Sequence, residues 1–241
     1  MRIARLAFLL PLCVMASQLA WTQAATDIDS DPHYSLLLAN DQVWVYQVSL
    51  RTGERSFVRH EHNFLIVTLQ DCEVAMWPEG NSDIMTQRFV QGTVGFYFGG
   101  RAIGLRNDQT VSYHNVTVEL LDPKVTTYGY QWNTGRWDYG ATTTSSVVDP
   151  HAPFASGLRL GPVMVIDVQL LPNGALPAPD HRSSELIIPV TDIDLRAGED
   201  SVRRSAGEVL WTPAGRKVKL VNAAGVPARL AVVQFAEADG N

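Results

Sequence analysis

The sequence repeats one pattern twice, and this internal repeat limits the possible folds more than any other feature of the chain. The apolar run Val43–Leu50 recurs as Val163–Leu170, 120 residues later. Three further positions recur at a common offset of 115 residues, with Gly92, Gly100 and Asn107 returning as Gly207, Gly215 and Asn222. The offset shortens because the first copy has a longer loop around residues 78–83. We therefore expect two similar units, at residues 40–123 and 158–237.

Both units have the residue pattern of β-structure. Short runs rich in Val, Ile, Tyr and Thr are separated by Gly, Pro, Asn or Asp at intervals of about 8 to 12 residues, which is typical of all-β sandwiches and barrels. No stretch after residue 30 keeps a helical period over three turns. The pattern predicts an all-β chain with little helix, made of two tandem antiparallel β-barrels.

A linker of different composition, residues 124–157, separates the two units. It contains aromatic residues that alternate at period two on either side of an Asn-Thr-Gly turn: Tyr128, Tyr130, Trp132, Trp137 and Tyr139. This spacing predicts a β-hairpin with aromatic side chains on one face. Such a face can pack the two units together, cover a pocket, stack sugar rings or form the interface of a homodimer.

Residues 1–24 have the pattern of a secretory signal peptide. Arg2 and Arg5 precede a short apolar run over residues 6–16, and small residues precede a cleavage point near Ala25. The run is about half the roughly 20 residues that span a bilayer. We therefore expect a secreted or periplasmic protein with no membrane association after the signal is removed.

Charge and cysteine content exclude some classes of partner and linkage. The formal net charge of −6 lacks the basic surface that neutralises phosphates, so nucleic acid is not an expected partner. Cys72 is the single cysteine after the predicted signal, so the mature chain has no intramolecular disulfide. We expect Cys72 to be a small buried apolar residue at a strand end.

The repeated glycines and asparagines occur at the spacing of a known family motif. The second motif of the cupin family, G-x5-P-x-G-x2-H-x3-N, is similar to Gly92, Phe98, Gly100, Ile103 and Asn107, and again to Gly207, Pro213, Gly215, Val218 and Asn222. The first motif, G-x5-H-x-H-x3,4-E, resembles Gly53 through His60 and His62 with one extra residue, and more weakly Gly174 through His181 to Glu185. The resemblance implies a bicupin, with two double-stranded β-helix barrels.

The resemblance also implies a metal site, but several ligand positions are changed. Metal-binding members of the family usually offer three histidines and one carboxylate to a divalent transition metal. His60 and His62 would share one face of a strand, as a chelating pair requires. The histidine of the second motif is replaced by Ile103 in the first unit and by Val218 in the second. His114 could complete a site in the first unit if Val116 and its alternate neighbours point inward.

Three interpretations of His60 and His62 therefore stay open: a metal site, a polar or acid–base site without metal, and a structural role. His181 and Glu185 would form a weaker site in the second unit. Arg101 and Arg216 occupy equivalent positions after the motif glycines, where a guanidinium could bind a carboxylate or phosphate, or remain solvated.

Two functions from different classes follow. The first is an exported bicupin-like protein, without a complete metal site or any cofactor, that binds a small polar ligand such as a sugar or a carboxylate. The second is an enzyme, an isomerase, lyase or dioxygenase, that uses His60 and His62 with or without a single divalent metal. A structural or partner-binding role through the aromatic hairpin is a third possibility.

Overall fold

The computed structural model describes residues 24–81, 83–125, 154–176, 182–216 and 218–236, and in this part of the chain the structure is almost entirely β. The sole helical element among these residues is a short 3-10 turn, η1 (Ile28–Ser30). None of their helices is long and apolar enough to cross a membrane. The all-β prediction with little helix is confirmed.

The first barrel consists of two five-stranded sheets that face each other. The outer sheet has the order β1 (Thr26–Asp27), β4 (Arg55–His60), β9 (Arg101–Arg106), β6 (Cys72–Pro78) and β7 (Met85–Phe89). The inner sheet has the order β2 (Tyr34–Ala39), β3 (Val43–Leu50), β10 (Tyr113–Leu120), β5 (Asn63–Thr68) and β8 (Val94–Tyr97). Because β1 and β2 belong to these sheets, the barrel begins before residue 40.

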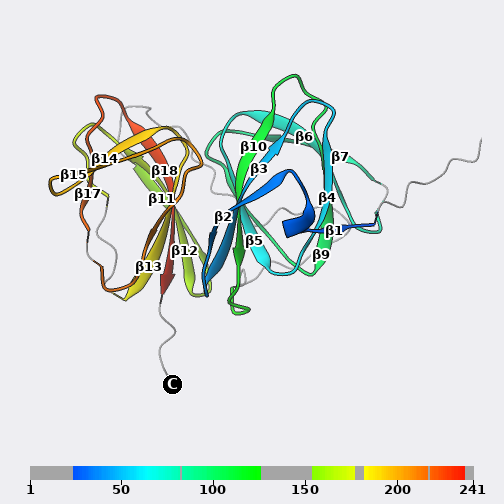
Figure 1. Ribbon diagram of the computed structural model, residues 1–241, viewed down its shortest axis with the longest axis horizontal. Coiled ribbons are helices and arrows are strands. Elements are labelled where there is room, and N and C mark those ends of the chain that lie inside the picture. Colours follow the sequence, from blue (N-terminus) through cyan, green and yellow to red (C-terminus); the bar gives the residue numbers. More distant parts are fainter. Residues whose placement is uncertain (1–23, 82, 126–153, 177–181, 217, 237–241) are drawn as a thin grey trace, which may run out of the picture.

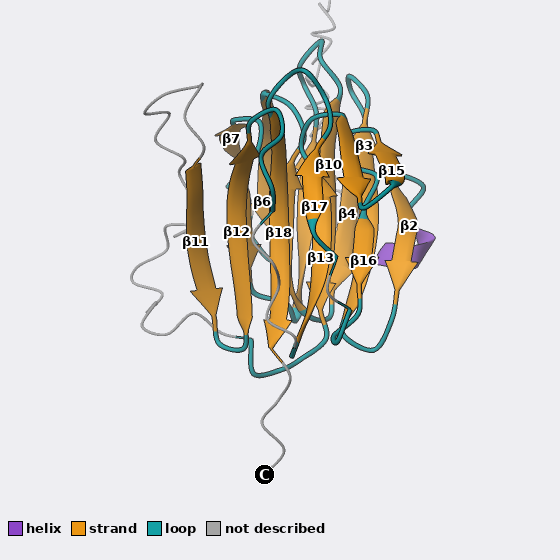
Figure 2. Cartoon of the chain, turned by 90° about the vertical axis from the view of Figure 1, so that its left-hand side faces the viewer, coloured by secondary structure: helices purple, strands orange, loops and turns teal. Residues whose placement is uncertain are grey.

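The second barrel repeats this arrangement with a smaller outer sheet. Its inner sheet has the order β11 (Phe154–Leu160), β12 (Val163–Leu170), β18 (Ala228–Ala236), β13 (Ser183–Pro189) and β16 (Leu210–Thr212). Its outer sheet has the order β15 (Asp200–Arg204), β14 (Ile193–Ala197) and β17 (Leu220–Asn222). Figure 1 shows the barrels side by side with their inner sheets toward each other, and Figure 2 shows the inner strands of the second barrel in the order β11, β12, β18, β13, β16.

Within the described residues, buried apolar side chains form three cores: one inside each barrel and one between the two inner sheets. Alternate residues of an inner strand point to opposite sides, so Tyr46 and Val48 enter the first barrel whereas Val43 and Val45 enter the core between the barrels. Both faces of these strands are therefore buried, which explains their nearly continuous apolar sequences.

The repeated asparagines make the same hydrogen bonds in both barrels. The Asn107 side-chain amide donates to the carbonyls of Leu50 at 3.0 Å and Val111 at 2.9 Å. The Asn222 amide donates to Leu170 at 3.0 Å and Val226 at 2.9 Å, and each side-chain oxygen accepts a backbone amide two residues later. The two repeats are thus the same structural unit, and their asparagines hold equivalent turns.

The first glycine of each repeated motif lies where one barrel meets the other. Gly92 and Gly207 have φ values of +80° and +85°, a region that favours glycine. A Cβ at Gly92 would lie 2.3 Å from the guanidinium carbon of Arg229, and one at Gly207 would lie 2.8 Å from Cδ1 of Leu69. Close approach between the barrels, as well as turn conformation, therefore accounts for these two glycines.

An ion pair within the second barrel holds an arginine that also contacts the first barrel at the Gly92 side. The Arg229 guanidinium donates to both carboxylate oxygens of Asp167, at 3.1 and 2.8 Å, and to the backbone carbonyl of Gln91 at 2.6 Å.

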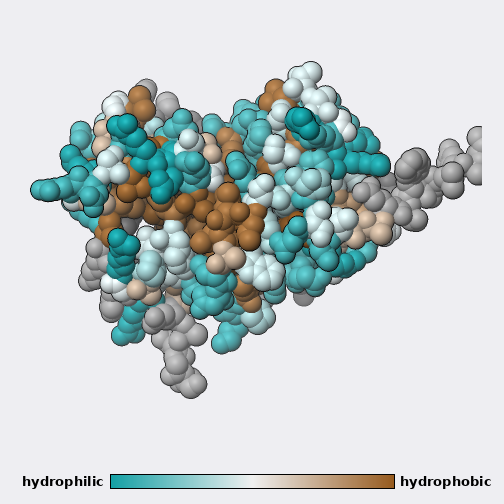
Figure 3. Space-filling model, viewed as in Figure 1, coloured by the Kyte–Doolittle hydropathy of each residue, from teal (hydrophilic) through white to brown (hydrophobic). Residues whose placement is uncertain are grey.

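Figure 3 shows apolar residues gathered along the junction on one face of the molecule. Leu36 and Leu37 on the edge strand β2 are 55% and 39% exposed.

Candidate functional site

A histidine and a glutamate form a buried pair inside the first barrel. His60 is the last residue of β4, and its Nδ1 lies 2.5 Å from Oε1 of Glu119 on β10. The other carboxylate oxygen of Glu119 accepts the backbone amide of His62 at 3.2 Å. His60 is 3% exposed and Glu119 is 1% exposed. A buried carboxylate requires such partners, so the fold holds Glu119 and His60 in one arrangement.

Aromatic rings fix the orientation of His60. Its imidazole stacks on Phe64 with 3.8 Å between ring centroids and 12° between planes, and Phe64 stacks in turn on Tyr97. The ring of Tyr34 meets His60 edge-on at 6.3 Å. His60 is therefore held on one ring nitrogen by Glu119 and on one face by Phe64.

A second buried carboxylate lies next to this group. Asp31 accepts hydrogen bonds from the Ser56 hydroxyl at 2.9 Å and the His33 backbone amide at 2.9 Å, and its Oδ1 lies 2.7 Å from His33 Nδ1. Burial, followed by the charge of Asp31 and then that of Glu119, raises the pKa of Tyr34 above its ordinary value. This part of the barrel is therefore unfavourable for additional negative charge.

Strand β10 lines the first barrel with polar side chains along its whole length. Tyr113, Asn115, Thr117 and Glu119 point inward and are at most 1% exposed. The Thr117 hydroxyl donates to Asn115 Oδ1 at 2.9 Å. Four buried side-chain atoms lack a hydrogen-bond partner among the described residues, and three of them lie here: the hydroxyls of Thr68 and Tyr113 and the amide nitrogen of Asn115. Asn115 and Thr68 are direct neighbours across β10 and β5.

The prediction that His114 faces this interior is wrong. Val116, Val118 and Leu120, which share its side of β10, pack in the core between the barrels. His114 is half-buried on that same side, opposite to His60 and Glu119. The assignment failed because both faces of β10 are buried, so an apolar face does not identify the interior of the barrel. Glu119, which the sequence analysis missed, is the residue that meets His60.

The strand expected to carry both His60 and His62 ends at His60. Glu61 and His62 form the corner between β4 in the outer sheet and β5 in the inner sheet, so period-two alternation does not extend to His62. The His62 ring packs edge-on against Trp44 with 5.6 Å between centroids. Glu119 nevertheless links the two residues, through the His60 ring and the His62 backbone.

Apolar residues occupy equivalent places in the two barrels where the resemblance puts a histidine. Ile103 is buried in the core of the first barrel, and Val218 packs against the core of the second. Among the described residues, no three His, Cys, Asp or Glu side chains lie close enough together to hold a metal. In the first barrel, Ile103 lies where the resemblance puts a histidine, and Glu119 contacts His60 through Nδ1, so Nε2 is the ring nitrogen of His60 that remains for a ligand.

The two arginines of the repeat differ in their surroundings. Arg101 is the direct neighbour of His60 across β4 and β9, so both side chains lie on the inward side that Ile103 also uses. Arg101 is half-buried, and burial lowers the pKa of its guanidinium. Arg216 is exposed in the turn that follows Gly215. The structure therefore places Arg101, but not Arg216, beside a buried polar group.

The second barrel has a different polar pair at the matching end. Glu185 on β13 is 5% exposed, and its Oε1 accepts a hydrogen bond of 2.6 Å from the side-chain amide of Gln234. Burial raises the pKa of Glu185. Gln234 pairs with Glu185 across the strands in the same register in which Glu119 pairs with Phe64. Gln234 is therefore the repeat equivalent of Glu119, and Glu185 is the equivalent of Phe64. His181 and the aromatic hairpin at residues 128–139 lie outside the described residues.

Cys72 begins β6 and packs against the core of the first barrel. It is half-buried, and burial, followed by the charge of Asp71, raises the pKa of its thiol to about 12. The expected strand-end position is confirmed. A thiol with this pKa is almost fully protonated at neutral pH and is a poor nucleophile.

No family model and no curated protein matches the sequence. Solved structures do match the fold. AerE from Microcystis aeruginosa superposes with a TM-score of 0.62 at 9% identity, over 88% of this chain and 97% of that chain. A cupin 2 conserved barrel domain protein from Leptotrichia buccalis gives 0.53 at 9% identity, over 88% and 92%. Oxalate decarboxylase from Bacillus subtilis gives 0.56 at 9% identity, over 81% and 68%. At these identities the likeness concerns the fold alone.

Proposed function

Because the chain folds as two tandem cupin barrels, we propose that it binds a small polar ligand in the first barrel without a metal. The observation that carries this proposal is the buried polar lining of β10 opposite His60. The hydroxyls of Tyr113 and neighbouring Thr68 and the amide nitrogen of Asn115 make no hydrogen bond to any described residue. Buried polar groups are nearly always hydrogen-bonded, so this interior favours a polar ligand that can bond to these atoms.

The charges around the lining indicate which ligands fit best. Asp31 and Glu119 are both buried near His60, which disfavours an anionic group deep in the barrel. Arg101 adjoins His60 at the end of β4 and offers a guanidinium for a carboxylate. A sugar, or a hydroxylated acid whose carboxylate lies toward Arg101, satisfies both constraints.

A second candidate function is acid–base catalysis on the same ligand. A carboxylate on Nδ1 orients an imidazole and leaves Nε2 as the nitrogen that can exchange a proton with a substrate. The 2.5 Å contact between His60 and Glu119 has this arrangement. The reaction would be proton transfer, as in an isomerase or lyase, with His60 as the acid or base. His62 would position Glu119 through its backbone amide.

Ligand titrations on matched variants test the proposal. A panel of aldoses, uronic acids and hydroxy acids is titrated by calorimetry into the wild type, His60→Gln and His114→Gln. Loss of one hydrogen bond to a polar ligand should weaken binding about tenfold in His60→Gln, while His114→Gln, on the other face of β10, stays within about twofold. Equal binding by all three proteins, or a stoichiometric transition metal retained through dialysis, would contradict the proposal.

We also propose that the protein is exported to the periplasm or the medium and acts there, either as a single chain or as a homodimer. The support for export is the pattern of residues 1–24, which lie almost entirely outside the described residues. Fractionation followed by N-terminal sequencing should find a mature chain that starts near Ala25. Recovery in the cytoplasm with Met1 retained would overturn this part.

A further inference from the structure

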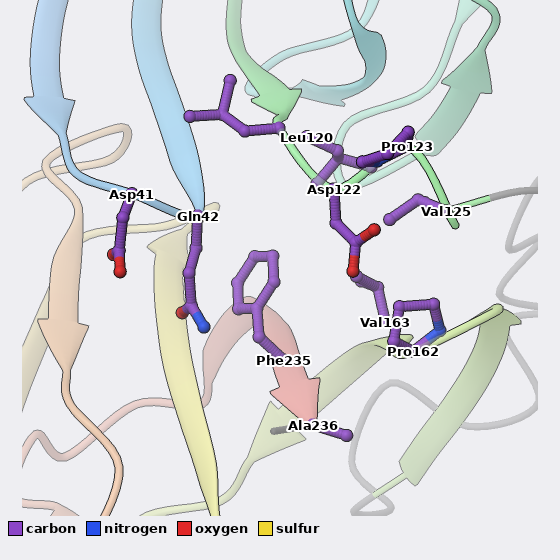
Figure 4. Close-up of a pocket in the computed structure, with 11 residues that line it drawn as sticks. Asp41, Gln42, Leu120, Asp122, Pro123, Val125, Pro162, Val163, Phe235 and Ala236 are labelled. Atoms are coloured by element: carbon purple, nitrogen blue, oxygen red, sulfur yellow. The ribbon is translucent and has the colours of Figure 1, made fainter. Parts of the chain in front are cut away.

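A pocket of about 240 Å³ lies between the barrels, separate from the polar lining of the first barrel. It is found where β10 and β18 end and where β3 and β12 begin. Its walls include Leu120 and Val125 from the first barrel and Val163 and Phe235 from the second, all of them buried. Figure 4 shows these walls on either side of an open centre.

The internal repeat explains why a pocket forms at this place. Leu120 and Phe235 are equivalent residues of the two repeats, because Leu120 pairs with Val43 and Phe235 pairs with Val163. Matching strand ends therefore meet across the junction. Gln42 fixes their spacing, since its side-chain oxygen accepts a hydrogen bond from the Ser184 hydroxyl of the other barrel.

The polar groups of the pocket are acidic or neutral. The Asp122 side chain extends from the end of the first barrel toward Phe235 and Val163 (Figure 4). One of its oxygens accepts the backbone amide of Lys124 at 2.8 Å, which fixes its orientation. Asp41 and Gln42 add a second carboxylate and an amide, and among the described lining residues none is basic. An apolar enclosure with a carboxylate directed into it attracts a cation that carries a hydrophobic body.

We propose that this junction pocket binds a small organic ammonium ion. The ammonium group pairs with Asp122, and a ring or short branched chain of about eight non-hydrogen atoms packs against the apolar walls. The inference does not depend on the function proposed for the first barrel, because Asp122 and Leu120 face away from the interior that holds His60.

Titration of benzylammonium into the purified protein tests the inference, with benzyl alcohol as the neutral probe of the same shape. We expect saturable binding of the amine at least about fivefold tighter than that of the alcohol. Asp122→Asn should weaken amine binding about fivefold, whereas Asp200→Asn, an exposed carboxylate on β15, should leave it unchanged. Equal affinity for amine and alcohol, no saturable amine binding, or no effect of Asp122→Asn would overturn the inference.

A blocking variant locates the amine independently of charge. Ala236 lines the pocket from the exposed end of β18, so Ala236→Trp should abolish amine binding, while Ala223→Trp in an exposed turn should not. His60→Gln should leave amine binding unchanged. Amine binding that survives Ala236→Trp, or that is lost in His60→Gln, would place the amine elsewhere and overturn the inference. Sugar or carboxylate binding that is unaffected by Ala236→Trp keeps the two sites distinct.

Discussion

The two barrels have equivalent turns but carry different side chains at one inward position of β10 and β18. Asn107 and Asn222 make matching hydrogen bonds, and Ile103 and Val218 pack in matching cores. At the position of Glu119, however, the second barrel has Gln234. The first barrel consequently holds a carboxylate paired with a histidine, and the second holds a carboxylate paired with an amide.

A duplicated fold can in this way separate stability from function. The glycines and asparagines that set the turns are retained in both copies, because each copy must fold in the same way. The inward residues of β10 and β18 are free to differ, because the rest of each barrel supports them. We therefore expect substitutions at equivalent turn positions to have equal effects, and those at inward positions to have unequal effects.

The largest difference is expected at the inward pair. Glu119→Leu leaves the buried His60 ring and the His62 amide without an acceptor, so it should lower the free energy of unfolding by about 3 to 4 kcal/mol. Gln234→Leu should cost only about 1 kcal/mol, because Glu185 can take up a proton when it loses its donor. Urea denaturation of both variants measures the difference, and similar losses would show that the barrels are energetically alike here.

The junction should be the next most sensitive place. Arg229→Met removes both hydrogen bonds to Asp167, which is 1% exposed, and one to Gln91. We expect a loss of about 3 kcal/mol. On the Gly207 side of the junction the nearest side chain is Leu69, so Leu69→Ala should cost about 2 kcal/mol. Chemical denaturation that ranks Leu69→Ala above Arg229→Met would argue against this picture of the interface.

The repeated asparagines should respond equally. Asn107→Ala and Asn222→Ala each remove two hydrogen bonds that a buried asparagine side chain donates, and each should lower stability by about 2 kcal/mol. Thermal unfolding of the two variants provides the comparison. Values that differ by more than about 1 kcal/mol would show that the turns are not equivalent.

The smallest effect concerns the pH dependence of the second barrel. Burial raises the folded-state pKa of Glu185, so the native protein keeps this proton over a pH range in which the unfolded chain has lost it. Stability should therefore fall as the pH rises from the ordinary glutamate pKa through the raised value, and level off above it. In Glu185→Gln this fall should be smaller than in the wild type. An identical pH profile for the two proteins would contradict the assignment.

The sequence predicts the fold better than it predicts the site. Glycine and asparagine report on turns, and turns depend on local conformation, so Gly92, Asn107 and their repeats identify the double barrel. The replacement of the motif histidines by Ile103 and Val218 is also visible, because it occurs at fixed spacing from those glycines. These features need no knowledge of distant contacts.

The buried pair is not visible in the same way. His60 and Glu119 are 59 residues apart in sequence, and only the order of strands brings them together. Alternation along β10 distinguishes two faces, but both are buried, so the pattern alone led to His114 instead of Glu119. The available signal is that Asn115, Thr117 and Glu119 alternate with apolar residues along the strand.

The most direct test of the account is to map a bound ligand onto the two barrels. Amide chemical shifts are recorded by NMR while the sugar or hydroxy acid that binds best is titrated in. The largest changes should cluster around His60, Arg101 and Thr117 in the first barrel, with none around Glu185. Changes centred on Glu185 and Gln234, or spread evenly over both barrels, would contradict the claim that the first barrel carries the site.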